Sequence, residues 1–123
     1  MNVRGIRGAT TVDSDSPELI MFATKELLLK IIEANPTLNP DYVASAFFTV
    51  TDDLNSIHPA QAARQLGWSY VPMLCAREIP VPGSLPKCIR VLLHWNTDIE
   101  QKNIMHVYLH EAVILRPDLV KEK

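Results

Sequence analysis

The chain has 123 residues, 47% hydrophobic and 21% charged, with a formal net charge of −2. These values are typical of one globular domain, expected to span residues 1–123, and the acidic balance argues against non-specific nucleic-acid binding. No apolar run approaches the ~20 residues of a membrane span, and residues 1–12 lack the apolar region of a signal peptide. With two cysteines and no metal-type CxxC pair, we expect a reduced, cytoplasmic protein.

Seven elements are expected in the order β-α-β-α-β-β-β. The segments expected to contain them, in that order, are 2–12, 13–36, 44–51, 52–67, 70–79, 87–95 and 104–115. The first strand contains Gly5 and Gly8, and glycine within a strand suggests a bulge or a close approach by another group. The first helix has the clearest signals, because Ser16 suits the N-cap, Pro17 suits the first turn, and apolar residues then recur at helical spacing.

The later elements are marked mainly by the residues that begin and end them. A capped turn over 39–43 leads into the second strand. The second helix can begin at Pro59 and end with Gly67 as its C-cap, and Arg116-Pro117 stops the last strand. Two helices packed against one mixed sheet give an α+β fold. A small sheet covered on one side leaves apolar strand faces bare, so oligomerisation is expected.

Several common catalytic motifs are missing from the sequence. There is no phosphate-binding glycine loop, no GxSxG nucleophile elbow and no HExxH metal pair. His106 and His110 flank Tyr108 on one expected strand face and could in principle hold a metal. Histidines on a partly solvated strand are much more often not ligands, and the same holds for His94 and His58. We therefore expect neither a metal nor a cofactor.

Arg90 is the most unusual residue, because it lies inside the apolar stretch KCIRVLLHW at 87–95. Neither face of this expected strand looks solvated, and an unpaired buried charge is strongly destabilising. Glu78, at the end of the preceding strand and across a hairpin-like turn, is the expected partner. One interpretation is a purely structural ion pair. The other is a pocket where several arginines, a tyrosine and one carboxylate bind a small polyanion.

Other candidates have simple structural explanations. Arg7, Arg64 and Arg116 also lie in or beside apolar segments or on the second helix. For Arg64 and Arg116 alone, a surface ion pair or a snorkelling side chain is the simpler interpretation. Cys75 lies in an expected strand, where cysteine is more often a small core residue than a nucleophile.

Four segments give the chain a resemblance to a known family. RGIRGATTV, PAQAARQLGWSYVP, CIRV and HVYLHEAVILRPDL resemble segments of the trimeric α/β chorismate mutases, the monofunctional class that is distinct from the all-helical mutases. The resemblance covers nearly the whole chain in order. It implies a homotrimer with a barrel-like core of packed sheets and active sites in the clefts between subunits. It also implies cofactor-free conversion of chorismate to prephenate, the branch step toward phenylalanine and tyrosine.

The resemblance further implies roles for the residues at matching positions. Arg7 matches an arginine that binds a substrate carboxylate, and Tyr108 a tyrosine that contacts the side-chain carboxylate. Arg90 matches the cation beside the ether oxygen of the breaking bond. Glu78 matches the carboxylate that accepts a hydrogen bond from the ring hydroxyl, near which Cys75 is also expected. The residues expected at the pocket wall or at its mouth are Leu74, Cys75, Ala60, Leu115, Arg64 and Arg116.

Two positions depart from the family pattern. His58 stands where the family often has an aromatic residue, and Gln61 where it often has lysine. Both belong to the mouth, so they bear on substrate capture more than on the chemistry. Two other functions stay open: a trimeric imine deaminase of related fold, and a non-catalytic trimer that binds a carboxylate metabolite. The set Arg7, Glu78, Arg90 and Tyr108 favours catalysis, because a sensor need not keep a cation at the ether oxygen.

Overall fold

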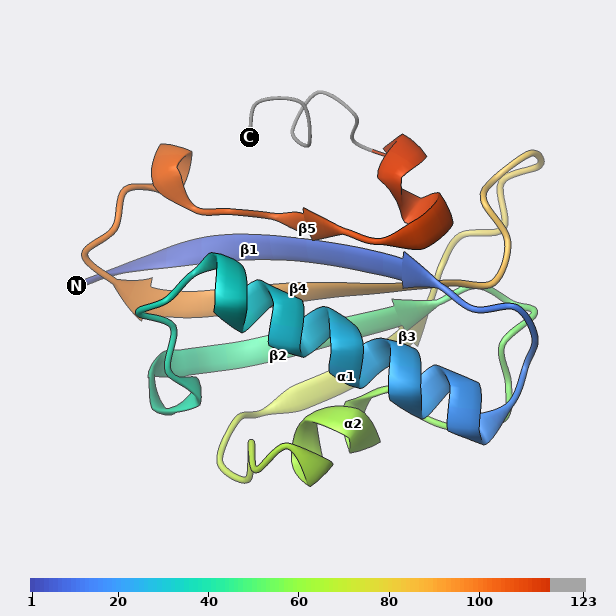
Figure 1. The fold of residues 1–123 in the computed structure, drawn as a ribbon, viewed down its shortest axis with the longest axis horizontal. Coiled ribbons are helices and arrows are strands. Elements are labelled where there is room, and N and C mark those ends of the chain that lie inside the picture. The colour runs from blue at the N-terminus through green and yellow to red at the C-terminus, as the bar shows by residue number, and fades with distance from the viewer. Residues whose placement is uncertain (116–123) are drawn as a thin grey trace.

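One mixed sheet organises the computed structural model, which describes residues 1–115 (Figure 1). Its helices and strands are β1 (Asn2–Thr11), α1 (Pro17–Ala34), β2 (Val43–Val50), α2 (Ala60–Gln65), β3 (Met73–Arg77), β4 (Cys88–Thr97) and β5 (Val107–Tyr108). Short 3₁₀ helices are η1 (Pro40–Tyr42), η2 (Gln101–Asn103) and η3 (His110–Leu115). This order confirms the predicted β-α-β-α-β-β-β arrangement and the α+β class.

The sheet has the strand order β3-β2-β4-β1-β5. β4 runs antiparallel to β1 and β2, whereas β3 is parallel to β2 and β5 is parallel to β1. The predicted hairpin between the strands of Glu78 and Arg90 is therefore wrong, because β2 separates β3 from β4. Since β3 leaves the sheet at the same end as β2, the connection over 78–87 must pass the end of β2 before β4 begins.

Both helices cover the same face of the sheet (Figure 1). As predicted, α1 begins after Ser16, whose hydroxyl accepts a hydrogen bond from the Leu19 N–H at 3.3 Å, with Pro17 in the first turn. The end of α2 is followed by Gly67, whose φ of +91° suits glycine. The core between helices and sheet contains Ile6, Leu27, Leu28, Ile31, Phe48, Ala63, Trp68, Val91, Leu93 and Trp95.

The opposite face of the sheet is largely bare in the single chain. We call it the open face; strand alternation and register place Phe47, Thr49, Leu74, Arg90 and Leu92 on it. Phe47 is 39% exposed, Leu74 63% and Leu92 37%. Near β1 and β5, part of this face is covered by the short η3. The prediction that helices would cover only one side of the sheet is thus confirmed.

Two strand predictions were too long. The last strand, expected over 104–115, pairs with β1 only at Val107 and Tyr108. His110 has a φ of +54°, a left-handed conformation that ends the extended chain, and η3 follows it. The second helix, expected to begin at Pro59 and to be capped by Gly67, is confirmed as Ala60–Gln65, whereas β3 starts at Met73 rather than residue 70. Within residues 1–115, no helix is both long and apolar enough to cross a bilayer.

Candidate active site

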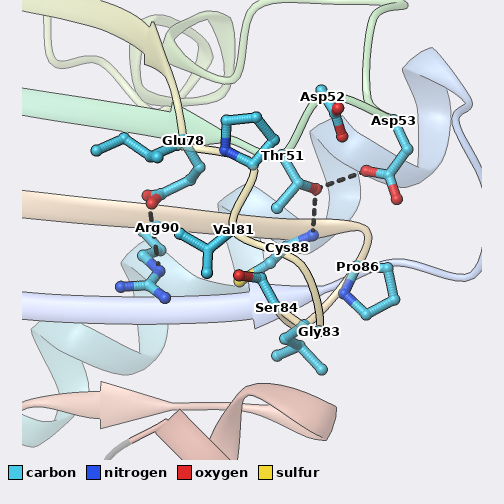
Figure 2. Close-up of a pocket in the computed structure, with 13 residues that line it drawn as sticks. Thr51, Asp52, Asp53, Glu78, Val81, Gly83, Ser84, Pro86, Cys88 and Arg90 are labelled. Carbon is cyan, nitrogen blue, oxygen red and sulfur yellow. Dashed lines mark hydrogen bonds and ion pairs between the residues drawn. The ribbon is translucent and has the colours of Figure 1, made fainter.

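Arg90 and Glu78 meet on the open face although their strands are not neighbours. Glu78 directly follows β3, and its backbone N–H donates to the Val50 carbonyl of β2 at 2.9 Å. Arg90 Nε lies 3.6 Å from Glu78 Oε2 (Figure 2). The predicted ion pair is confirmed, but the Arg90 side chain is 47% exposed in the single chain. The expectation of a buried guanidinium is therefore wrong for one chain, because the face that carries it is the open face.

Thr49, which the sequence did not single out, joins this pair. It lies directly opposite Arg90 in the register of β2 and β4. Its hydroxyl donates a hydrogen bond to Oε2 of Glu78, the same oxygen that faces Arg90. The sequence places Thr49 in an expected strand, where alternation determines which residues share its face. Its partner depends on the strand register, which the sequence does not show.

Five of the predicted residues line one pocket of about 300 Å³: Arg7, Glu78, Arg90, Tyr108 and Leu115. They come from β1, the end of β3, β4, β5 and the end of η3, so the fold brings together residues far apart in the sequence. Two guanidinium groups against one carboxylate leave the pocket with excess positive charge. Arginine forks of this kind suit carboxylate groups on a small anion.

Tyr108 is held at this pocket by the segment that precedes it. The Arg7 N–H donates to Nδ1 of His106 at 2.9 Å. Buried Asn35, at the end of α1, donates from Nδ2 to the Met105 carbonyl at 2.9 Å and accepts from the Met105 N–H at 3.0 Å. These bonds fix the segment beside β1, and Tyr108 is only 8% exposed there.

Comparisons with known proteins place the chain in a family. The family model described as chorismate mutase type I matches residues 3–119. The chain belongs to this family. The chorismate mutases AroH of Thermus thermophilus and Bacillus subtilis are 62% and 52% identical to it, over 95% and 97% of this chain and 96% and 94% of the relatives. A solved chorismate mutase from Clostridium thermocellum has a TM-score of 0.87 at 48% identity, over 89% of this chain and 97% of its own.

The family match confirms the prediction of a chorismate mutase, which is an isomerase. The thiol next to Arg90 is buried rather than activated as a nucleophile. Cys88 lies beside Arg90 in a second pocket of about 230 Å³ (Figure 2). Its N–H donates to the Thr51 hydroxyl at 3.0 Å, and that hydroxyl donates to Asp53 Oδ1 at 2.5 Å. Burial raises the pKa of the Cys88 thiol, so it stays neutral at physiological pH.

Cys75 does not join the main pocket in this member of the chorismate mutase family. It pairs with Phe48 in the register of β3 and β2, and both pack against the core under the helices. Cys75 instead lines a pocket of about 380 Å³ together with His58, which lies just before α2. Cys75 and His58 therefore lie on a concave surface separate from the pocket of Arg7, Glu78, Arg90 and Tyr108.

The remaining predicted residues lie on or near α2 and β3. Ala60 is buried, at 3% exposure, and is part of the core. Gln61 and Arg64 are exposed on α2, and Leu74 is exposed on the open face. Arg116 lies outside the described residues. Among residues 1–115, neither of the two pockets that Arg90 lines includes Ala60, Gln61, Arg64 or Leu74.

Three of the four histidines considered as metal ligands have other partners. His106 accepts the hydrogen bond from Arg7 described above, and His110 Nε2 lies 2.9 Å from Glu26 Oε1. His94 Nδ1 lies 2.9 Å from the Ser45 hydroxyl. In the described part of the chain, no three metal-ligating side chains are grouped as a metal site.

Proposed function

We propose that this chain converts chorismate to prephenate, in the branch of the shikimate pathway that leads to phenylalanine and tyrosine. The observation that carries the proposal is the pocket where Arg90, paired with Glu78, opens onto the same space as Arg7 and Tyr108. The relatives described above are themselves chorismate mutases, which supports this reaction. It breaks one C–O bond and forms one C–C bond within a single molecule, so it requires no nucleophile, obligatory proton transfer or cofactor.

The first catalytic contribution is conformational. Chorismate is a flexible dianion, and it rearranges only from a compact, chair-like geometry. Arg7 on β1 and Tyr108 on β5, two neighbouring strands, line one pocket and are suited to hold the carboxylates of chorismate. When binding already holds the substrate in the reactive geometry, the entropy lost in ordering it no longer adds to the activation barrier.

The second contribution is electrostatic. Negative charge builds on the ether oxygen as the C–O bond stretches. Arg90 on β4, held by Glu78, supplies a cation that is already oriented before the charge develops. Such a group stabilises the transition state more than the ground state. In this proposal, Glu78 also accepts a hydrogen bond from the ring hydroxyl of the substrate.

We further propose a homotrimer with a barrel-like core, in which a second subunit completes each site. Exposed apolar side chains on the open face support a subunit interface there. The predicted residues form two groups, which supports a site shared between two subunits. One group lines the Arg90 pocket, and the other lies on β3, on α2 and in the loop before α2. The second group consists of His58, Ala60, Gln61, Arg64, Leu74 and Cys75. Light scattering should give three times the 13.8 kDa chain mass.

One assay tests the reaction. The ultraviolet absorbance of chorismate is followed with purified protein and no added cofactor, and the product is identified by chromatography. Saturable loss of chorismate with prephenate as product supports the mutase, and Arg90→Ala purified in parallel controls for contaminating activity. Binding without turnover would favour the metabolite-binding trimer. Inertness toward chorismate would favour the imine deaminase.

A further inference from the structure

We infer that Thr49 is a positioning residue of this site, whose hydroxyl fixes the Glu78 carboxylate and, through it, the Arg90 guanidinium. The inference rests on the proposed function, because it concerns the same pocket. Thr49 itself lines this pocket, but the role inferred for it is to orient Glu78 and Arg90 rather than to act on the breaking bond. Its effect on turnover passes through Glu78 and Arg90.

The geometry places Thr49 between the two charged residues. On one side of β2, Thr49 pairs with Arg90 of β4; on the other, it pairs with Ala76 of β3, two residues before Glu78. The Thr49 hydroxyl donates to Glu78 Oε2, and Arg90 Nε lies 3.6 Å from that oxygen. One carboxylate oxygen is therefore held from two directions, by a neutral donor on β2 and a cation on β4.

The ion pair alone holds the Arg90 and Glu78 side chains only loosely. Arg90 is 47% exposed, Glu78 is 26% exposed, and their closest atoms lie 3.6 Å apart. Charge pairs in such surroundings are screened by solvent and hold their partners loosely. A hydroxyl that donates to a carboxylate makes a shorter, directional, charge-assisted bond. Thr49 thus supplies the orientation that the ion pair does not.

The Thr49 side chain is itself well suited to this task. Threonine is branched at Cβ and has few accessible rotamers, and β2 is flanked by strands on both sides. Among residues 1–115, both contacts of the Glu78 carboxylate use Oε2. The other oxygen, Oε1, is therefore left for the ring hydroxyl of the substrate. Thr49 helps to select which oxygen of Glu78 serves the protein and which serves the ligand.

Three substitutions test the inference. Thr49→Val removes the hydroxyl at nearly constant volume, and Thr49→Ser keeps it. Thr10→Val is the matched control, because the buried Thr10 hydroxyl on β1 has no hydrogen-bond partner within residues 1–115. We expect Thr49→Val to lower kcat about 10-fold, the size expected for loss of a bond to a charged group. Thr49→Ser should recover most of this loss, and Thr10→Val should leave kcat unchanged.

A double-mutant cycle separates positioning from a structural role. In a Glu78→Ala background, Thr49→Val should change kcat far less than it does in the wild type, because its target is gone. A structural role would give equal losses in both backgrounds together with a lower thermal midpoint. If Thr49→Val does not fold, Thr49→Ala takes its place in the same cycle.

The outcomes distinguish this inference from the proposed function. If the wild type turns over chorismate and Thr49→Val keeps full activity, the role of Thr49 is overturned and the proposed function stands. An additive double-mutant cycle would have the same consequence. A wild-type protein that does not act on chorismate overturns the proposed function, whatever Thr49 does. Loss of kcat in Thr49→Val, rescue by Thr49→Ser and a non-additive cycle together support the inference.

Discussion

Arg90 and Glu78 lie 3.6 Å apart with a whole strand between the strands that carry them. The Glu78 side chain reaches over Thr49 on β2 to face Arg90 on β4. Because β4 is bonded along its length to β1 and β2, its backbone gives Arg90 a rigid base. A cation with a rigid base and a fixed carboxylate partner is oriented before the reaction begins, which is the condition for electrostatic catalysis.

Arg90→Ala should remove nearly all turnover. Losing one fixed donor to a developing negative charge typically lowers kcat by about 10²–10³. Arg90→Lys should also be poor, because an ammonium is a point charge without the directed fork of the guanidinium. Steady-state kinetics on chorismate measures both, and light scattering checks that assembly is unchanged. A variant without Arg90 that kept a tenth of wild-type kcat would contradict the electrostatic role.

Glu78→Gln should lower kcat less than Arg90→Ala does. The amide oxygen of glutamine can still accept hydrogen bonds from the substrate and from Thr49, but its neutral side chain no longer attracts Arg90. The kcat values of the two variants, measured under the same conditions, test this prediction. A loss in Glu78→Gln as large as that in Arg90→Ala would mean that the charge of Glu78, rather than its acceptor oxygen, is the essential feature.

Local signals were sufficient for much of the fold. Ser16 and Pro17 correctly marked the start of α1, and Gly67 the end of α2, because capping depends on residues within one turn. The end of the chain was predicted less well. His110 adopts a positive φ, and no residue preference at that position signalled the break that turns an expected strand into η3.

The candidate site was only partly readable from the sequence. The Arg90–Glu78 pair was predicted correctly from the opposite charges of the two residues. The hairpin expected to bring their strands together is not present in the structure. Thr49 was missed because its partners depend on how three strands align, which is a non-local property. Cys75 shows a related limit: alternation tells which residues share a face, but not which face the helices cover.

Gly8→Ala should destabilise the fold. A Cβ at this position would lie 2.8 Å from Ile31 Cδ1, 3.1 Å from Val91 Cγ1 and 3.2 Å from Leu27 Cδ1, all in the core under α1. Overpacking of this kind lowers the free energy of unfolding by about 1–3 kcal/mol. Gly5→Ala on the same strand is the matched control, because its nearest neighbour would be Leu92 Cδ1 at 3.7 Å. Urea unfolding at one protein concentration should rank Gly8→Ala well below Gly5→Ala; equal stabilities would contradict the close approach of α1 to β1.

Asn35→Ala should reduce both stability and substrate affinity. The substitution removes the bonds from Nδ2 to the Ile31 and Met105 carbonyls, at 2.9 Å each, and the bond from the Met105 N–H to Oδ1 at 3.0 Å. Leaving a buried backbone group without a partner lowers the free energy of unfolding by about 1–3 kcal/mol. Because the same bonds hold the segment before Tyr108, KM should rise more than kcat falls. Asn39→Ala, at an exposed cap of η1, is the control and should leave KM unchanged.

Asp15 should make the stability of the fold depend on pH in the acidic range. Hydrogen bonds from Ser56 and Asn55 to the Asp15 carboxylate, and the charge of Arg77, hold the pKa of Asp15 below its usual value of 3.8. Because the folded pKa is lower than the unfolded pKa, the stabilisation is complete above the unfolded pKa and is lost as pH falls through the folded value. The gap in unfolding free energy between wild type and Asp15→Asn should therefore be largest near neutral pH.

Urea unfolding from about pH 7 to about pH 3 measures the change in this gap, which should shrink as Asp15 becomes protonated in the wild type. Asp13→Asn, which removes one negative charge from the same loop, separates the specific bonds of Asp15 from the general effect of net charge. A gap of constant size down to the most acidic sample would show that the carboxylate charge of Asp15 does not stabilise the loop before α2.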